Sequence, residues 1–179
     1  KEKDHGFFGW SVIIPFVGFI VFTALFFVFK TPIENYFSQN SELFVDYIYF
    51  VIPMAFFMMY LLVFETNSNL LMRIVVPKFI REVGIRLMTL IVYLLYAFDV
   101  INLDGMVVSL CLTYGIATLL NVIYLFTLKK ISFKIQPSYI SKWLRKDFIF
   151  YTLFLIISSL ASNLVPVLNT FFVSGKLGL

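Results

Sequence analysis

Long apolar runs alternate with short polar connections along almost the whole chain. Five runs are long enough, as helices, to cross a hydrocarbon layer of roughly 30 Å, which takes about 20 residues. These runs cover residues 10–29, 43–64, 83–101, 106–128 and 148–173. They are continuously apolar and do not alternate with a period of two, which favours helices over membrane β-strands. The pattern predicts an all-α integral membrane protein, a polytopic bundle of about five transmembrane helices.

Basic residues in the connections predict the orientation of these helices. Twelve of the 14 lysine and arginine residues fall before the first run, between the second and third or in the first turn of the third, or between the fourth and fifth. The remaining two, Lys30 and Lys176, fall on the opposite side. The positive-inside rule therefore places the N-terminal end of the chain in the cytoplasm and its C-terminal end outside.

The connection before the fifth run has a mixed character. Residues 132–147 are too polar to span a membrane, yet Tyr139, Ile140 and Trp143 lie there among Lys142 and Arg145. One interpretation is an interfacial amphipathic element on the cytoplasmic surface. The other is an ordinary loop, and the sequence leaves both open.

Composition excludes a soluble domain. Hydrophobic residues make up 61% of the 179 residues and charged residues only 13%, far from the balance of soluble domains. The net charge of +4 reports topology here, so we predict membrane lipids as partners and no nucleic acid. The single cysteine, Cys111, excludes a disulfide or zinc framework within the chain, and His5 is expected to be solvated.

Polar residues of the fifth run gather on one side of the predicted helix, within an arc of roughly 160°. The members are Tyr151, Thr152, Ser158, Ser159, Ser162, Asn163, Pro166, Asn169, Thr170 and Ser174. Polar groups in hydrocarbon are costly unless they face protein or water. We interpret this stripe as a cavity wall, with Ser162, Asn163 and Asn169 as candidate substrate-binding residues.

The fourth run carries a weaker version of the same pattern. Tyr114, Thr118 and Asn121 are spaced at i, i+4 and i+7, which places them on one side of a helix. They are interpreted first as interhelical hydrogen-bonding groups. The alternative is a second wall of the cavity, in which Asn121 is a candidate substrate contact.

Charged residues cluster before the third run. Pro77 is suited to the first turn of a helix, and Glu82 and Arg86 then pair at i, i+4. The guanidinium groups of Arg81 and Arg86 are candidates for bidentate phosphate binding near the cytoplasmic mouth, with interfacial anchoring as the alternative. Glu65, at the end of the second run, is a possible partner for one of them.

Motifs of catalysis do not appear in the sequence. It contains no Ser/His/Asp set, no helical His pair, no deep carboxylate dyad and no nucleotide-binding glycine loop. We therefore predict that the chain is not an enzyme and that it holds no metal and no cofactor.

Five motifs resemble a known family. They are residues 4–10 (DHGFFGW), 47–53 (YIYFVIP), 64–69 (FETNSN), 75–86 (VVPKFIREVGIR) and 163–173 (NLVPVLNTFFV). Together they are similar to bacterial polysaccharide flippases of the Wzx type, in the multidrug/oligosaccharidyl-lipid/polysaccharide exporter superfamily. The resemblance is strongest to members from Bacteroidetes, and it implies that the chain is an internal piece of a longer transporter.

The resemblance implies a two-lobe exporter fold in the bacterial inner membrane, with the C-terminal end of the chain in the periplasm. Residues 1–128 would be four helices that end the first lobe, 129–147 a cytoplasmic interfacial linker, and 148–179 the first helix of the second lobe. The implied function is export of undecaprenyl-pyrophosphate-linked oligosaccharide by alternating access, in polysaccharide or lipopolysaccharide biosynthesis.

Two other functions remain open. A cation-coupled multidrug antiporter of the same superfamily is expected to carry an acidic residue deep within a helix. Asp46, Asp99, Asp104 and Asp147 all fall near predicted helix ends, which favours the flippase. A non-transporting membrane scaffold would need the polar stripe of the fifth run to be packed wholly against protein.

Overall fold

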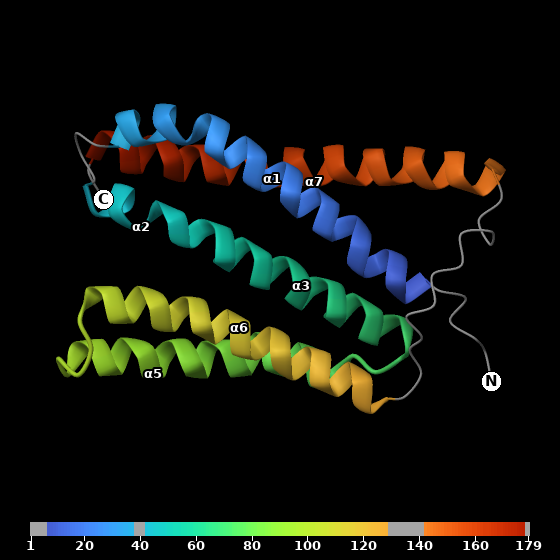
Figure 1. The fold of residues 1–179 in the computed structure, drawn as a ribbon, viewed down its shortest axis with the longest axis horizontal. Helices are drawn as coiled ribbons and strands as arrows, with labels where there is room; N and C mark the ends of the chain where they lie inside the picture. Colours follow the sequence, from blue (N-terminus) through green and yellow to red (C-terminus); the bar gives the residue numbers. More distant parts are fainter. Residues whose placement is uncertain (1–6, 38–41, 129–141, 178–179) are drawn as a thin grey trace. The chain divides into compact units, whose positions relative to one another are not determined.

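The computed structural model describes residues 7–37, 42–128 and 142–177, and every regular element among them is a helix (Figure 1). The predicted all-α class is therefore confirmed for this part of the chain. The elements are α1 (Phe7–Phe37), α2 (Glu42–Tyr47), η1 (Ile48–Phe50), α3 (Val51–Leu70), α4 (Val75–Phe79), η2 (Ile80–Gly84), α5 (Ile85–Ala97), α6 (Leu103–Thr127) and α7 (Lys142–Leu177).

Three helical stretches in the described residues are long and apolar enough to cross a membrane. They are Phe8–Asn35, Phe44–Leu70 and Leu103–Thr127, and they correspond to the first, second and fourth predicted runs. The chain is thus a multi-pass membrane protein with three candidate spans. The other two predicted spans remain predictions, because α5 has only 13 residues and α7 contributes a shorter apolar stretch, Phe150–Ser162.

The chain folds as two compact units. The first contains residues 1–27 and 47–135, and the second contains residues 28–46 and 136–179. In the second unit, Lys30 and Glu34 form an ion pair of 3.2 Å on the last turns of α1, and the ring of Phe37 packs on that of Phe44 from α2. Helix α7 begins at Lys142, so the last six residues of the predicted linker 129–147 are helical, while residues 129–141 lie outside the described ranges.

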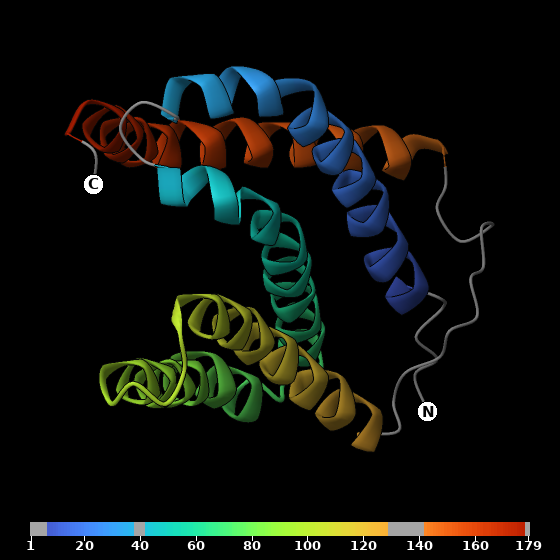
Figure 2. The same ribbon diagram turned by 60° about the vertical axis from the view of Figure 1, so that its left-hand side comes forward.

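Helix α6 is the centre of packing in the first unit, with α3 on one side of it and α5 on another (Figures 1 and 2). Leu61, Ile85 and Ala117, one from each helix, form a buried cluster. Gly115 lies at the contact with α3, where a Cβ atom would already be in van der Waals contact with the ring of Phe57, at 3.4 Å. Small residues are common in membrane helix pairs, where close backbone packing replaces the hydrophobic driving force.

Side chains in the first half of α1 contact α3. The amide of Asn67 donates to the Ser11 hydroxyl at 3.0 Å, and the Tyr60 hydroxyl donates to the carbonyl of Val12. Further along, the rings of Phe19 and Phe56 meet edge to face with centroids 5.1 Å apart. Polar contacts therefore hold one end of this pair and aromatic contacts the middle.

Two helices of the first unit end in the same way, with a residue in the left-handed region. After α3, Met72 has φ 58°, and the backbone N–H groups of Arg73 and Met72 donate to the carbonyls of Ser68 and Asn69, both at 2.9 Å. This is the Schellman arrangement, which satisfies the last carbonyls of a helix. Asp99, with φ 55°, ends α5 by the equivalent bonds.

A π-helical segment joins α4 to α5. The backbone stays helical through both junctions, with φ and ψ near −62° and −43° at Phe79 and near −61° and −44° at Ile85. A π turn holds one residue more than an α turn. Residues 75–97 therefore form a continuous helical rod in which η2, from Ile80 to Gly84, shifts the register of the side chains by about one position.

Candidate functional site

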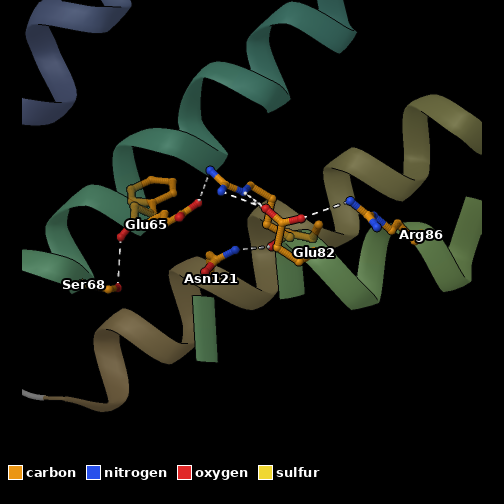
Figure 3. A network of polar contacts seen from close by, with 8 residues as sticks. Glu65, Ser68, Glu82, Arg86 and Asn121 are labelled. Atoms are coloured by element: carbon orange, nitrogen blue, oxygen red, sulfur yellow. Dashed lines mark hydrogen bonds and ion pairs between the residues drawn. The ribbon is translucent and has the colours of Figure 1, made fainter. Parts of the chain in front are cut away.

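Four charged side chains form a chain of alternating sign across the helices of the first unit (Figure 3). On η2, Nη1 of Arg81 lies 3.0 Å from Oε2 of Glu65 on α3, and Nη2 of Arg81 lies 2.9 Å from Oε1 of Glu82. Glu82 in turn accepts from Arg86 on α5 at 3.3 Å. The structure thus brings the two candidate arginines together through one carboxylate, and it confirms the predicted Glu82–Arg86 pair and the predicted partnership of Glu65.

Glu65 is the buried end of this chain. Its side chain is only 9% exposed, and it lies five residues before the end of α3, inside the candidate span Phe44–Leu70. Its Oε2 atom receives no well-directed hydrogen bond within the described residues, although Arg81 is 3.0 Å away. The interaction is therefore an ion pair that offsets the charge, since a lone carboxylate in an apolar bundle would be very costly.

Arg86 is the accessible end. Its side chain is 79% exposed, whereas that of Arg81 is 34% exposed and is in contact with two carboxylates. A guanidinium has five N–H donors, and the single 3.3 Å contact to Glu82 leaves most of those of Arg86 available. Of the two candidate phosphate ligands, Arg86 is the one whose side chain is open to a ligand.

The π-helical segment determines which charged residues share a side of the rod. Lys78 and Arg86 are eight residues apart, and both are exposed. Two turns of α-helix take about seven residues, and the π turn adds one. The insertion therefore places Lys78 and Arg86 on the same side of the rod, with Glu82 between them.

Asn121 lies next to this network on α6 and is completely buried (Figure 3). Its amide nitrogen donates to the carbonyl of Ala117 at 3.1 Å, while Oδ1 has no donor among the residues that the structure describes. In this conformation Asn121 is closed to any ligand. Its role as a substrate contact would require α6 to separate from its neighbours.

Thr118, one turn before Asn121, shows how α6 is attached to α3. Its hydroxyl lies 2.9 Å from the carbonyl oxygen of Phe57 on α3 and 2.8 Å from that of Tyr114 on its own helix. This is the interhelical hydrogen bond that the spacing of Tyr114, Thr118 and Asn121 predicts. The prediction that Thr118 is an interhelical hydrogen-bonding group is therefore confirmed.

Several polar contacts between helices were not anticipated from the sequence. Asn67 and Ser68, both buried, continue the polar surface of α3 from Glu65 toward its end, and Asn67 reaches Ser11 on α1. Tyr47 also donates a hydrogen bond to Asp104 at the start of α6. The sequence signal for Asn67 and Ser68 is the run of four polar residues at 66–69.

The polar stripe that the sequence predicts on the fifth run belongs to helix α7. Ser162 is exposed, and its hydroxyl donates to the carbonyl of Ser158 at 3.0 Å, as Thr170 does to Pro166. These bonds satisfy the hydroxyls within their own helix. Asn163 and Asn169 belong to the same helix, but their side chains lie outside what the structure describes. The predicted cavity wall therefore remains a prediction.

Comparison with protein-family models, with curated proteins and with solved structures finds no match for this chain. Groups of three or more His, Cys, Asp or Glu side chains that would hold a metal ion do not occur within the described residues.

Proposed function

We propose that the protein exports a lipid-linked oligosaccharide across the bacterial inner membrane by alternating access, with undecaprenyl-pyrophosphate-linked oligosaccharide as the substrate. In this proposal the α4–η2–α5 rod and α7 add two crossings to the three candidate spans, which gives the five helices that the resemblance implies. The rod from Val75 to Ala97 is about 35 Å long at 1.5 Å per residue, which is enough for one crossing.

The observation that carries the proposal is the exposed guanidinium of Arg86. It lies about 12 Å farther along the rod than Lys78, at 1.5 Å per residue. If Lys78 is at the headgroup level, Arg86 is below it, where a charged side chain is stable only beside protein or water. A pyrophosphate group that enters from the cytoplasmic side would find there a planar donor suited to bidentate binding.

The other charged residues of the network hold Arg86 in position. Glu82 accepts from Arg86 and is itself held by Arg81, and Arg81 is anchored to α3 by Glu65. We therefore assign Arg81 a positioning role and Arg86 the contact with the pyrophosphate. The polar stripe on α7, with Ser162, Asn163 and Asn169, supplies hydroxyl and amide groups for the glycan in this scheme, as lipid-linked sugars require a polar path through the membrane.

The experiment replaces Arg86 in the full-length protein and measures polysaccharide on the cell surface. Arg86→Ala should reduce export strongly, and Arg86→Lys should restore only part of it, since lysine lacks the planar fork. The control is Arg73→Ala, an exposed cation outside the network, which should leave export close to normal. All variants should be present in the membrane at wild-type levels, and normal export by Arg86→Ala would contradict the proposed contact.

A cation-coupled antiporter is the second candidate, and Glu65 favours it. The four aspartates Asp46, Asp99, Asp104 and Asp147 fall near predicted helix ends, whereas Glu65 is a buried carboxylate inside a candidate span. Arg81 already offsets its charge, which favours the flippase in this conformation. Transport in proteoliposomes distinguishes the two: proton- or sodium-driven drug efflux that is lost in Glu65→Gln would support the antiporter.

A further inference from the structure

The turn between α3 and α4 combines exposed cations with exposed apolar side chains. No acidic residue occurs between Glu65 and Glu82, and Arg73 and Lys78 are both exposed. Neither lies within ion-pair distance of a carboxylate in the described part of the chain, whereas Arg81 and Arg86 do. The positive charges of Arg73 and Lys78 are therefore not neutralised by a carboxylate of the described residues.

Apolar side chains surround these cations and continue along the rod. Met72, in the turn, is 91% exposed, and Ile74 beside Arg73 is also exposed. On the rod, Val75, Phe79, Val83 and Leu87 are all exposed and follow one another at four-residue steps, which keeps them on one side of a helix. Lys78 directly precedes Phe79, so it flanks this apolar stripe at about 100° around the helix axis.

We propose that this surface binds an anionic glycerophospholipid of the surrounding membrane. Its phosphate would contact Arg73 and Lys78, and an acyl chain would lie along the stripe formed by Val75, Phe79, Val83 and Leu87. Charge complementarity selects an anionic headgroup, because two cations without carboxylate partners gain nothing comparable from a zwitterionic one. The stripe selects a lipid over a soluble anion, since its apolar area is covered only by a chain.

The geometry of the rod fits a lipid that stands along the helix axis. Lys78 and Leu87 are separated by about 13 Å at 1.5 Å per residue, which is less than half the roughly 30 Å hydrocarbon thickness. The π-helical segment lies between them, from Ile80 to Gly84. The bound lipid would thus belong to one leaflet, the leaflet on the basic side of the protein.

The test measures lipid binding to the purified protein in detergent by native mass spectrometry. Phosphatidylglycerol and phosphatidylcholine of equal chain length are the probes. The wild type should retain phosphatidylglycerol at least about tenfold more tightly, since one cation near an anionic lipid surface strengthens binding by about fivefold. Arg73→Gln combined with Lys78→Gln should abolish this preference, and Lys78→Gln alone should reduce it by about fivefold.

The matched control is Lys30→Gln combined with Lys176→Gln, which removes two cations from the predicted opposite side of the membrane and should keep the preference. Retention of the preference in the Arg73 and Lys78 double variant would overturn the proposal. So would competition by glycerol phosphate as effective as that of the intact lipid, because it would show a soluble-anion site. The proposal does not rest on the transport function, and Arg86→Ala should leave phosphatidylglycerol binding unchanged.

Discussion

Arg81 and Glu65 form an ion pair of 3.0 Å between the π-helical segment η2 and helix α3. The two residues are 16 positions apart in the sequence, and the carboxylate side chain is only 9% exposed. The pair therefore fixes the rod 75–97 against a neighbouring candidate span. Arg86, the proposed pyrophosphate contact, is held in turn through Glu82.

Replacing Glu65 with glutamine should destabilise the protein by about 2 kcal/mol. The substitution removes the buried charge that offsets Arg81, but Arg81 keeps Glu82, so the loss is smaller than for an isolated buried pair. Equilibrium unfolding in mixed micelles measures the effect. Glu34→Gln, which breaks the i, i+4 pair Lys30–Glu34, whose carboxylate is more exposed than that of Glu65, should cost no more than about 0.5 kcal/mol.

A double-mutant cycle separates this pair from general disruption. If Glu65→Gln and Arg81→Gln act through their mutual contact, the double variant should lose less stability than the sum of the two single losses, by roughly 1 kcal/mol or more. Simple additivity of the two losses would mean that the ion pair contributes no coupling.

Thr118→Val should weaken the contact between α3 and α6 by about 0.6 kcal/mol, the typical contribution of an interhelical hydrogen bond in membrane proteins. The hydroxyl reaches the carbonyl of Phe57 across the interface, and valine has nearly the same shape. Thr113→Val is the matched control on the same helix, because the Thr113 hydroxyl is also buried but bonds only to Ser109 of α6. Equal losses for the two variants would argue against the interhelical bond.

Met72→Gly should stabilise the protein by about 0.5 to 1 kcal/mol. Met72 occupies the left-handed region with φ 58°, where a Cβ atom costs roughly 1–2 kcal/mol and glycine costs nothing, although glycine also increases the entropy of the unfolded chain. Met72→Ala retains the Cβ atom and should give no such gain. Thermal unfolding in lipid-free detergent distinguishes the two variants, and a gain for both would point to loss of the exposed side chain as the cause.

Much of the fold follows from apolar length alone. The first, second and fourth runs are uninterrupted, and each became one long helical stretch. In the third run the helix begins before the apolar stretch: the run starts at Val83, whereas the rod begins at Val75, close to Pro77, which the sequence places in the first turn of a helix. The apolar run starts later because Lys78, Arg81 and Glu82 look too polar for a span, and a π-helical segment has no periodic signal of its own.

The charged network was only partly predictable. The i, i+4 spacing of Glu82 and Arg86 predicts their pair directly, and it is present. The burial of Glu65 depends on how α3 packs against its neighbours. The spacing of residues does not reveal this packing, so the sequence predicted a partner for Glu65 but not its burial. Asn121 illustrates the opposite case: its spacing matches a polar face, but packing buries the side chain completely.

The proposed function requires that the helices cross a bilayer with the Lys78 end of the rod in the cytoplasm. Cys111 is buried and is the one cysteine among the 179 residues, so the background for single-cysteine labelling is the full-length protein with Cys111 and every other cysteine replaced by serine. In intact spheroplasts a membrane-impermeant maleimide should label Val100→Cys, in the exposed turn between α5 and α6, and should label Lys78→Cys only after permeabilisation. Labelling of Lys78→Cys in sealed spheroplasts would contradict the orientation and, with it, the proposed side of substrate entry.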